Sequence, residues 1–179
     1  IGITVWANKT EIIKWRYDLS GSALIHSSET FGWLMISFIA VSFNYIFGTL
    51  LTANGNLKPM NILALTTVFI NISINLILIP YYGSTGAAFA SMITQFFTFF
   101  LQLYLCYKFF PSQSKRWSYI KLFLFAIIFC LSTFLINHHI EYFWQGKIII
   151  CVVTGILIGF FLKIIDFNEI KLFIKTAKN

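Results

Sequence analysis

Polar side chains stand inside the most apolar part of this sequence. Thr67, Asn71 and Asn75 recur every four residues and therefore share one face of a helix. Comparable side chains lie in the neighbouring apolar runs, at Asn44, Gln95 and Gln102. A carboxamide both donates and accepts hydrogen bonds, so such groups can join helices to one another or contact the hydroxyl groups of a ligand. We treat all six residues as candidates for the lining of a substrate cavity, and both roles stay open.

The sequence offers no group of residues typical of an enzyme. It has no carboxylate pair within an apolar segment, no arrangement of Ser, His and Asp, and no glycine-rich phosphate-binding loop. His138 and His139 stand beside Glu141, where the sequence favours a solvated loop over a metal or proton site. The three cysteines lack metal-like spacing and fit small buried side chains. We expect no catalytic residue, no metal and no cofactor.

The elements that position these amides belong in a membrane. The chain of 179 residues is 58% hydrophobic and 11% charged, and its mean hydropathy is +0.80. A soluble domain is about a quarter charged and could not keep so much apolar surface from water. The net charge of +7 forms no basic stripe interleaved with aromatic residues, so no nucleic acid is expected as a partner. The expected surroundings are a lipid bilayer.

Five uncharged runs are long enough to cross a hydrocarbon core, so the expected fold class is all-α, a polytopic membrane bundle of five transmembrane helices. The predicted spans are Phe31–Ala53, Met60–Pro80, Ser84–Tyr107, Tyr119–Asn137 and Lys147–Ile164. They divide the chain into an outer loop or interfacial segment (1–30), a five-helix transmembrane bundle (31–165) and a basic cytoplasmic tail (166–179). The sequence begins without Met or a signal-like region, so we expect a fragment that lacks earlier helices.

The basic residues predict how the spans are oriented. Nine of the 13 Lys and Arg residues fall on one side of the predicted spans. They are Lys58, Lys108, Lys115, Arg116, Lys121, Lys163, Lys171, Lys175 and Lys178. Cytoplasmic loops are enriched in Lys and Arg, so this side and the C-terminus should be cytoplasmic. The uncharged turn at Tyr81 and Tyr82 then faces outward.

Turn formers and small residues interrupt the apolar pattern between the second and third spans. Pro80 is expected to end one helix, and Gly83 permits a backbone conformation that other residues resist. The next helix carries small side chains on one face, which let helices approach closely in lipid. We predict a tight hairpin with a packing seam, and a similar seam in the fifth span. The turn and packing residues are Gly55, Pro80, Gly83, Gly86, Ala87, Ala90, Gly155 and Gly159.

Residues 47–91 resemble the C-terminal half of bacterial polysaccharide and O-antigen flippases. These belong to the multidrug, oligosaccharidyl-lipid and polysaccharide exporter superfamily. The resemblance rests on a helix that ends in Ala-Asn-Gly at 53–55, a long Ile, Leu and Asn helix that closes in Ile-Pro at 79–80, and the Tyr-Gly-x-x-Gly-Ala-Ala run at 82–88. Members have about twelve helices in two lobes, so this chain would supply helices eight to twelve.

The resemblance implies a transporter rather than an enzyme. The chain would be the C-terminal part of a flippase that moves an undecaprenyl-pyrophosphate-linked oligosaccharide, an O-antigen or capsule repeat, across the bacterial inner membrane by alternating access. Implied partners are the lipid-linked oligosaccharide, the bilayer, the missing N-terminal lobe and polysaccharide polymerase machinery. Pyrophosphate-binding cations would come mainly from that lobe. The alternatives are a multidrug or lipid II exporter of the same superfamily, or a membrane polysaccharide polymerase or acyltransferase.

Overall fold

The computed structural model describes residues 2–110, 116–139 and 144–162, and these residues form helices with no strand among them. Two compact units result, one from residues 2–113 and the other from residues 114–179. Unit 2–113 holds α1 (Gly2–Ala7), α2 (Lys9–Tyr17), α3 (Gly21–Ala53) and α4 (Leu57–Phe109). The second unit holds α5 (Arg116–His139) and α6 (Trp144–Phe161). Each unit is described by itself.

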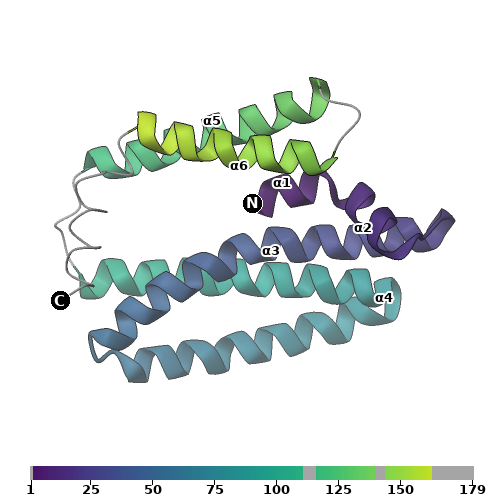
Figure 1. Ribbon diagram of the computed structural model, residues 1–179. Helices are drawn as coiled ribbons and strands as arrows, with labels where there is room; N and C mark the ends of the chain where they lie inside the picture. Colours follow the sequence, from purple (N-terminus) through teal and green to yellow (C-terminus); the bar gives the residue numbers. More distant parts are fainter. Residues whose placement is uncertain (1, 111–115, 140–143, 163–179) are drawn as a thin grey trace, which may run out of the picture. The chain divides into compact units, whose positions relative to one another are not determined.

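Helix α4 is folded back on itself (Figure 1). Its single non-helical residue is Gly83, with φ 56° and ψ −131°, and the chain reverses there. Side-chain bonds across the bend show the antiparallel register, because Thr67 lies 3.2 Å from Thr98 and Asn71 lies 3.2 Å from Thr94 between their bonding atoms. In each pair, the two residues lie nearly the same number of positions before and after Gly83. We call residues 57–82 the first leg and residues 84–109 the second leg.

Helix α3 packs against the second leg and runs parallel to it. Thr30 contacts Ser84 and Thr85 near the bend, and Asn44 contacts Gln95 further along. Residue numbers therefore rise together on the two helices. The return from α3 to α4 is a Schellman turn in which Gly55, at φ 80°, follows the helix end and the N–H of Asn56 bonds to the carbonyl of Leu51 at 3.1 Å.

The helix break lies at Gly83, and the prediction that Pro80 ends the first helix was wrong. Pro80 lies inside the helix, which continues to Tyr82. The fixed φ of proline is compatible with a helix. The N–H that Pro80 lacks removes one backbone hydrogen bond from the last turns of the first leg. The dihedral angles of Gly83 resemble the first central position of a type II′ turn, where a side chain would be strained. Glycine therefore makes the reversal.

The start of the second leg packs closely on the first leg. Gly86, Ala88 and Ala90 are buried, and Ala87 is partly buried. A Cβ atom added to Gly86 would lie 2.5 Å from the carbonyl oxygen of Leu78. Because that contact is to backbone, a larger residue would push the two legs apart. The small residues near the bend therefore line the interface between the legs.

Residues 2–17, within the predicted outer segment, form α1 and α2. Both pack on α3, and a Cβ added to Gly2 would lie 3.0 Å from the side chain of Ile39. The Lys9 side chain reaches Gly32, where a Cβ would lie 2.8 Å from Lys9 Cδ, and its ammonium lies 5.8 Å from the centre of the Trp6 ring. Because Trp6 also lies at Gly32, α1 runs antiparallel to α3. Helix α3 itself begins at Gly21, before the predicted span start at Phe31.

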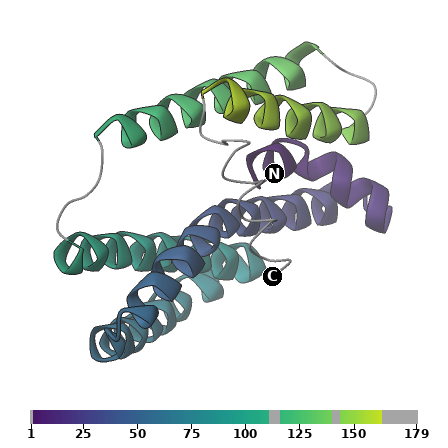
Figure 2. The same cartoon turned by 60° about the vertical axis from the view of Figure 1, so that its left-hand side comes forward.

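Helices α5 and α6 form an antiparallel pair, seen from two sides in Figures 1 and 2. A Cβ added to Gly155 would lie 2.8 Å from the ring of Phe129, so the ring occupies the space that glycine leaves. Cys151, Thr133 and Gly159 are buried in the same unit. A small residue in α6 therefore lets an aromatic ring of α5 approach its backbone.

Within the described part of the chain, three helices are long and apolar enough to cross a membrane, namely α3, α4 and α6. Large apolar side chains on the first leg remain exposed, among them Leu65, Phe69 and Leu76. Such a surface is expected where lipid replaces water. In α5 the apolar stretch with described side chains is the shorter Leu124–Asn137, so the count of five spans stays a prediction. The tail at 166–179, Glu141 and the end of the fifth predicted span lie outside the described residues.

Candidate functional site

The residues predicted to line a cavity form two groups in the structure, and Asn44 belongs to both. In the first group, side chains bond to one another between helices. Asn44 donates to the backbone oxygen of Gln95 at 3.1 Å and to its side-chain Oε1 at 2.9 Å. This pair joins α3 to the second leg. A hydrogen bond of this kind in a membrane is worth about 0.6 kcal/mol on average.

The predicted face of the first leg bonds largely to its own hairpin. Thr67 pairs with Thr98 at 3.2 Å, and Asn71 donates to Thr94 Oγ1 at 3.2 Å. Asn75 donates to the backbone and side-chain oxygens of Asn71, each at 2.9 Å. The regular spacing of Thr67, Asn71 and Asn75 thus serves bonds within the α4 hairpin.

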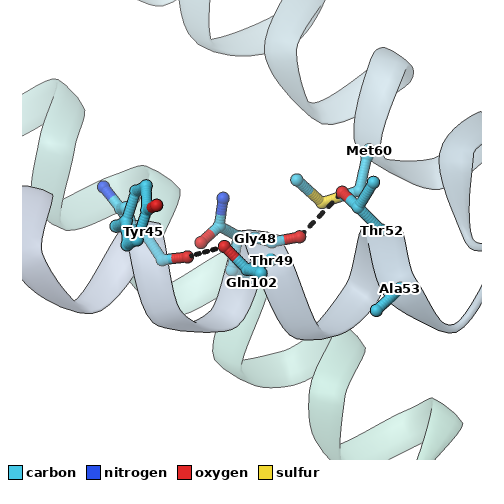
Figure 3. A pocket seen from close by; sticks show the side chains of 8 residues that line it. Tyr45, Gly48, Thr49, Thr52, Ala53, Met60 and Gln102 are labelled. Atoms are coloured by element: carbon cyan, nitrogen blue, oxygen red, sulfur yellow. Dashed lines mark hydrogen bonds between the residues drawn. The ribbon is translucent and has the colours of Figure 1, made fainter. Parts of the chain in front are cut away.

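The second group surrounds an open groove at the other end of the hairpin from Gly83 (Figure 3). The groove has a volume of about 570 Å³ and lies between the C-terminal half of α3, the start of the first leg and the end of the second leg. Its lining residues are Asn44, Tyr45, Gly48, Thr49, Thr52, Ala53, Met60 and Gln102. Two of the six predicted cavity residues, Asn44 and Gln102, therefore reach it.

Gln102 is a buried polar side chain in this groove. It is 5% exposed, and its Oε1 has no bonding partner among the described residues. Gly48 makes room for it, since a Cβ added there would lie 3.4 Å from Gln102 Nε2. Asn44 Oδ1, in the same lining, is also buried without a bonding partner among the described residues. A buried carbonyl oxygen without a partner costs free energy, so these atoms need a donor.

Two threonine hydroxyls supply hydrogen-bond acceptors to the groove. Thr49 donates its proton to the carbonyl of Tyr45 at 2.7 Å, and Thr52 donates to the carbonyl of Gly48 at 2.8 Å (Figure 3). With the protons committed to backbone oxygens, each hydroxyl oxygen offers lone pairs to the groove. The Thr49 and Thr52 hydroxyls can therefore accept hydrogen bonds but have no proton left to donate.

The groove is neutral. None of the described residues that line it is Lys, Arg, His, Asp or Glu. No group of three His, Cys, Asp or Glu residues that could hold a metal ion occurs among the described residues. The site can therefore bind an uncharged group through hydrogen bonds and apolar contact, with the Met60 methyl group and Ala53 as apolar surfaces.

Comparisons with known proteins identify no relative. No family model, curated protein or solved structure matches the chain. The assignment of a function therefore depends on the residues and on the geometry described above.

Sequence reasoning missed most of the groove. Tyr45 and Thr49 are four residues apart on α3, as are Gly48 and Thr52, and the two rows are adjacent. This spacing of polar and small residues near the end of a span was a usable signal. Both threonine hydroxyls bond to carbonyls of their own helix.

A second groove lies on the first leg and has a different character. It has a volume of about 450 Å³ and is lined by Ile72, Asn75, Leu76, Ile79 and Pro80. Asn75 supplies its polar side chain, and Asn75 Oδ1 has no bonding partner among the described residues. The largely apolar lining suits a lipid chain better than a polar ligand.

Proposed function

We propose that this chain is the C-terminal part of a membrane flippase that carries an undecaprenyl-pyrophosphate-linked oligosaccharide from the cytoplasmic to the outer leaflet of the bacterial inner membrane. The transport mechanism is alternating access between two lobes, of which this chain forms most of one. The C-terminus is cytoplasmic.

The groove at Gln102 carries this proposal. Its lining combines carboxamides and hydroxyls within helices that are otherwise apolar, a combination that suits a sugar more than a hydrophobic drug. An acid that could bind a cationic drug is missing from the groove lining. The resemblance of residues 47–91 to polysaccharide flippases points to the same class of substrate.

The arrangement of basic residues supports the proposed orientation. Lys58 lies at the start of α4 and Lys108 at its end, so the fold at Gly83 brings both to the same end of the hairpin. Tyr81 and Tyr82 lie at the opposite end and are exposed. The groove opens near the lysine end, which on this proposal is the cytoplasmic end where the substrate enters.

Complementation tests the proposal. The full-length gene that encodes this chain is expressed in a strain whose O-antigen flippase is deleted, and surface polysaccharide is measured with a matching antibody or by gel. We expect polymer to return. Absence of polymer from a protein that reaches the membrane, in strains that make each of several lipid-linked repeats, would contradict the proposal. Resistance to cationic drugs without restored polymer would indicate a multidrug exporter.

A further inference from the structure

The buried carboxamide of Gln102 has no structural use that the described residues reveal. It is 5% exposed, and its Oε1 has no bonding partner among the described residues. A leucine of similar size would fill the same space without that cost, because removing a polar group whose partner is absent is neutral or stabilising. An unsatisfied amide at the wall of a groove points to a ligand that completes its bonds.

We infer that the groove binds a neutral sugar ring and that Gln102 bonds to its hydroxyl groups. The inference rests on the proposed function and specifies its substrate: the groove takes an uncharged sugar of the repeat, and the pyrophosphate lies elsewhere. A hydroxyl both donates and accepts. It therefore satisfies the carboxamide whether the nitrogen or, after rotation of the terminal bond, the oxygen faces the groove.

The threonines exclude an anionic group from the same place. The Thr49 and Thr52 protons are bonded to backbone carbonyls at 2.7 and 2.8 Å, so the hydroxyl oxygens present acceptors to the groove. A phosphate or carboxylate also presents acceptors, and no Lys or Arg lines the groove to compensate. The ligand must bring hydrogen-bond donors without negative charge, and a neutral sugar brings them as O–H groups.

Tyr45 provides the apolar contact that a sugar ring needs. Its side chain lines the groove and is 78% exposed, and it lies one turn before Thr49 on α3. A sugar ring has one face of C–H groups that packs on an aromatic ring, while its hydroxyls point sideways to polar partners. Tyr45 thus supports the ring while Gln102 and the threonines bond to its edge.

Saturation-transfer NMR on the full protein in lipid nanodiscs tests this site, since the method detects weak sugar binding. The ligands are methyl β-glucopyranoside, methyl β-glucuronide and inorganic phosphate. We expect signal from the neutral sugar, at least fivefold less from the glucuronide, and no competition by phosphate. Equal binding of glucuronide and glucoside, or displacement of the glucoside by phosphate, would overturn the inference.

Two groove variants and one matched control assign the binding to this place. Gln102→Leu and Thr49→Val should each weaken binding of the glucoside, the first by about tenfold. Thr66→Val is the control, because Thr66 makes the same bond to the carbonyl four residues back (2.9 Å, to Ile62) but lies outside the groove. Unchanged binding in both groove variants would overturn the inference.

Thermal unfolding separates a ligand role from a structural one. Gln102→Leu should unfold at the same or a higher temperature than the unaltered protein, because it removes an unsatisfied group. A large loss of stability would show that Gln102 serves packing and would contradict the inference. Binding of the glucoside together with failed complementation would support the sugar site and contradict the flippase proposal. Successful complementation without glucoside binding would support the flippase proposal and contradict the sugar site.

Discussion

Single residues in unit 2–113 show how close packing replaces hydrophobic attraction between helices in lipid. Gly86 faces the carbonyl of Leu78, and Ala90 is fully buried. In a bilayer the helices gain nothing from leaving water, so their stability depends on backbone approach and dispersion. The absence of a side chain at Gly86 and the small side chain at Ala90 therefore permit the close spacing of the α4 legs.

Enlarging the seam should destabilise the hairpin. Ala90→Leu adds volume at a position with no exposed surface, and we expect a loss of about 1–3 kcal/mol in the free energy of unfolding. Denaturant titration of the protein in mixed micelles measures it. The matched control is Ala64→Leu, which makes the same change at an exposed position on the first leg and should change stability by less than about 0.5 kcal/mol. Equal effects of the two variants would contradict the seam.

The polar residues show what their spacing could and could not predict. The four-residue repeat of Thr67, Asn71 and Asn75 correctly places them on a common face, because helical geometry alone determines it. The partners depend on where α4 reverses and on how α3 lies beside it. Gln102 reached the groove and Gln95 did not, although the sequence treats the two amides alike.

At the scale of the elements, the reversal of α4 depends on Gly83. Turn formers and the small residues after them predict a hairpin at this place, and the structure has one. The residue that breaks the helix could not be chosen from the sequence, since both Pro80 and Gly83 can end a helix. The structure assigns the break to the residue with φ 56°.

Two substitutions distinguish these residues. Gly83→Ala should lower the free energy of unfolding by about 1–3 kcal/mol, because alanine is strained at φ 56° and ψ −131°. Pro80→Ala should leave stability unchanged or raise it, because Pro80 lies within a helix that alanine continues. Unfolding of both variants is followed by circular dichroism. A larger loss for Pro80→Ala than for Gly83→Ala would contradict the assignment.

The N-terminal elements were harder to predict. Residues 2–17 mix charged and apolar side chains, so their sequence predicts an outer loop or interfacial segment without indicating where it packs. In the structure they form α1 and α2 against α3, where Gly2 and Gly32 permit close contact. Such tertiary contacts leave no periodic signal in a short helix.

For the molecule as a whole, the groove shares one end of unit 2–113 with Lys58 and Lys108, while Lys9 packs at Gly32, toward the other end. Lys58 and Lys108 lie at the end where α4 begins and finishes, and Tyr81 and Tyr82 lie at the bend. The composition alone predicts a membrane protein, and three helices of the structure have the length and apolarity to span a bilayer. We propose from the distribution of Lys and Arg that the end with Lys58 and Lys108 faces the cytoplasm.

We propose that the α4 hairpin crosses the membrane, with its bend outside and both its ends in the cytoplasm. Cysteine labelling in intact cells tests it most directly. Single cysteines are introduced by Tyr82→Cys, Lys58→Cys and Lys108→Cys into a protein whose three native cysteines are replaced by alanine, and the cells are treated with a membrane-impermeant maleimide.

We predict that Tyr82→Cys is labelled in intact cells, while Lys58→Cys and Lys108→Cys are labelled after the membrane is opened. Labelling of Tyr82→Cys and Lys108→Cys from the same side would contradict the account.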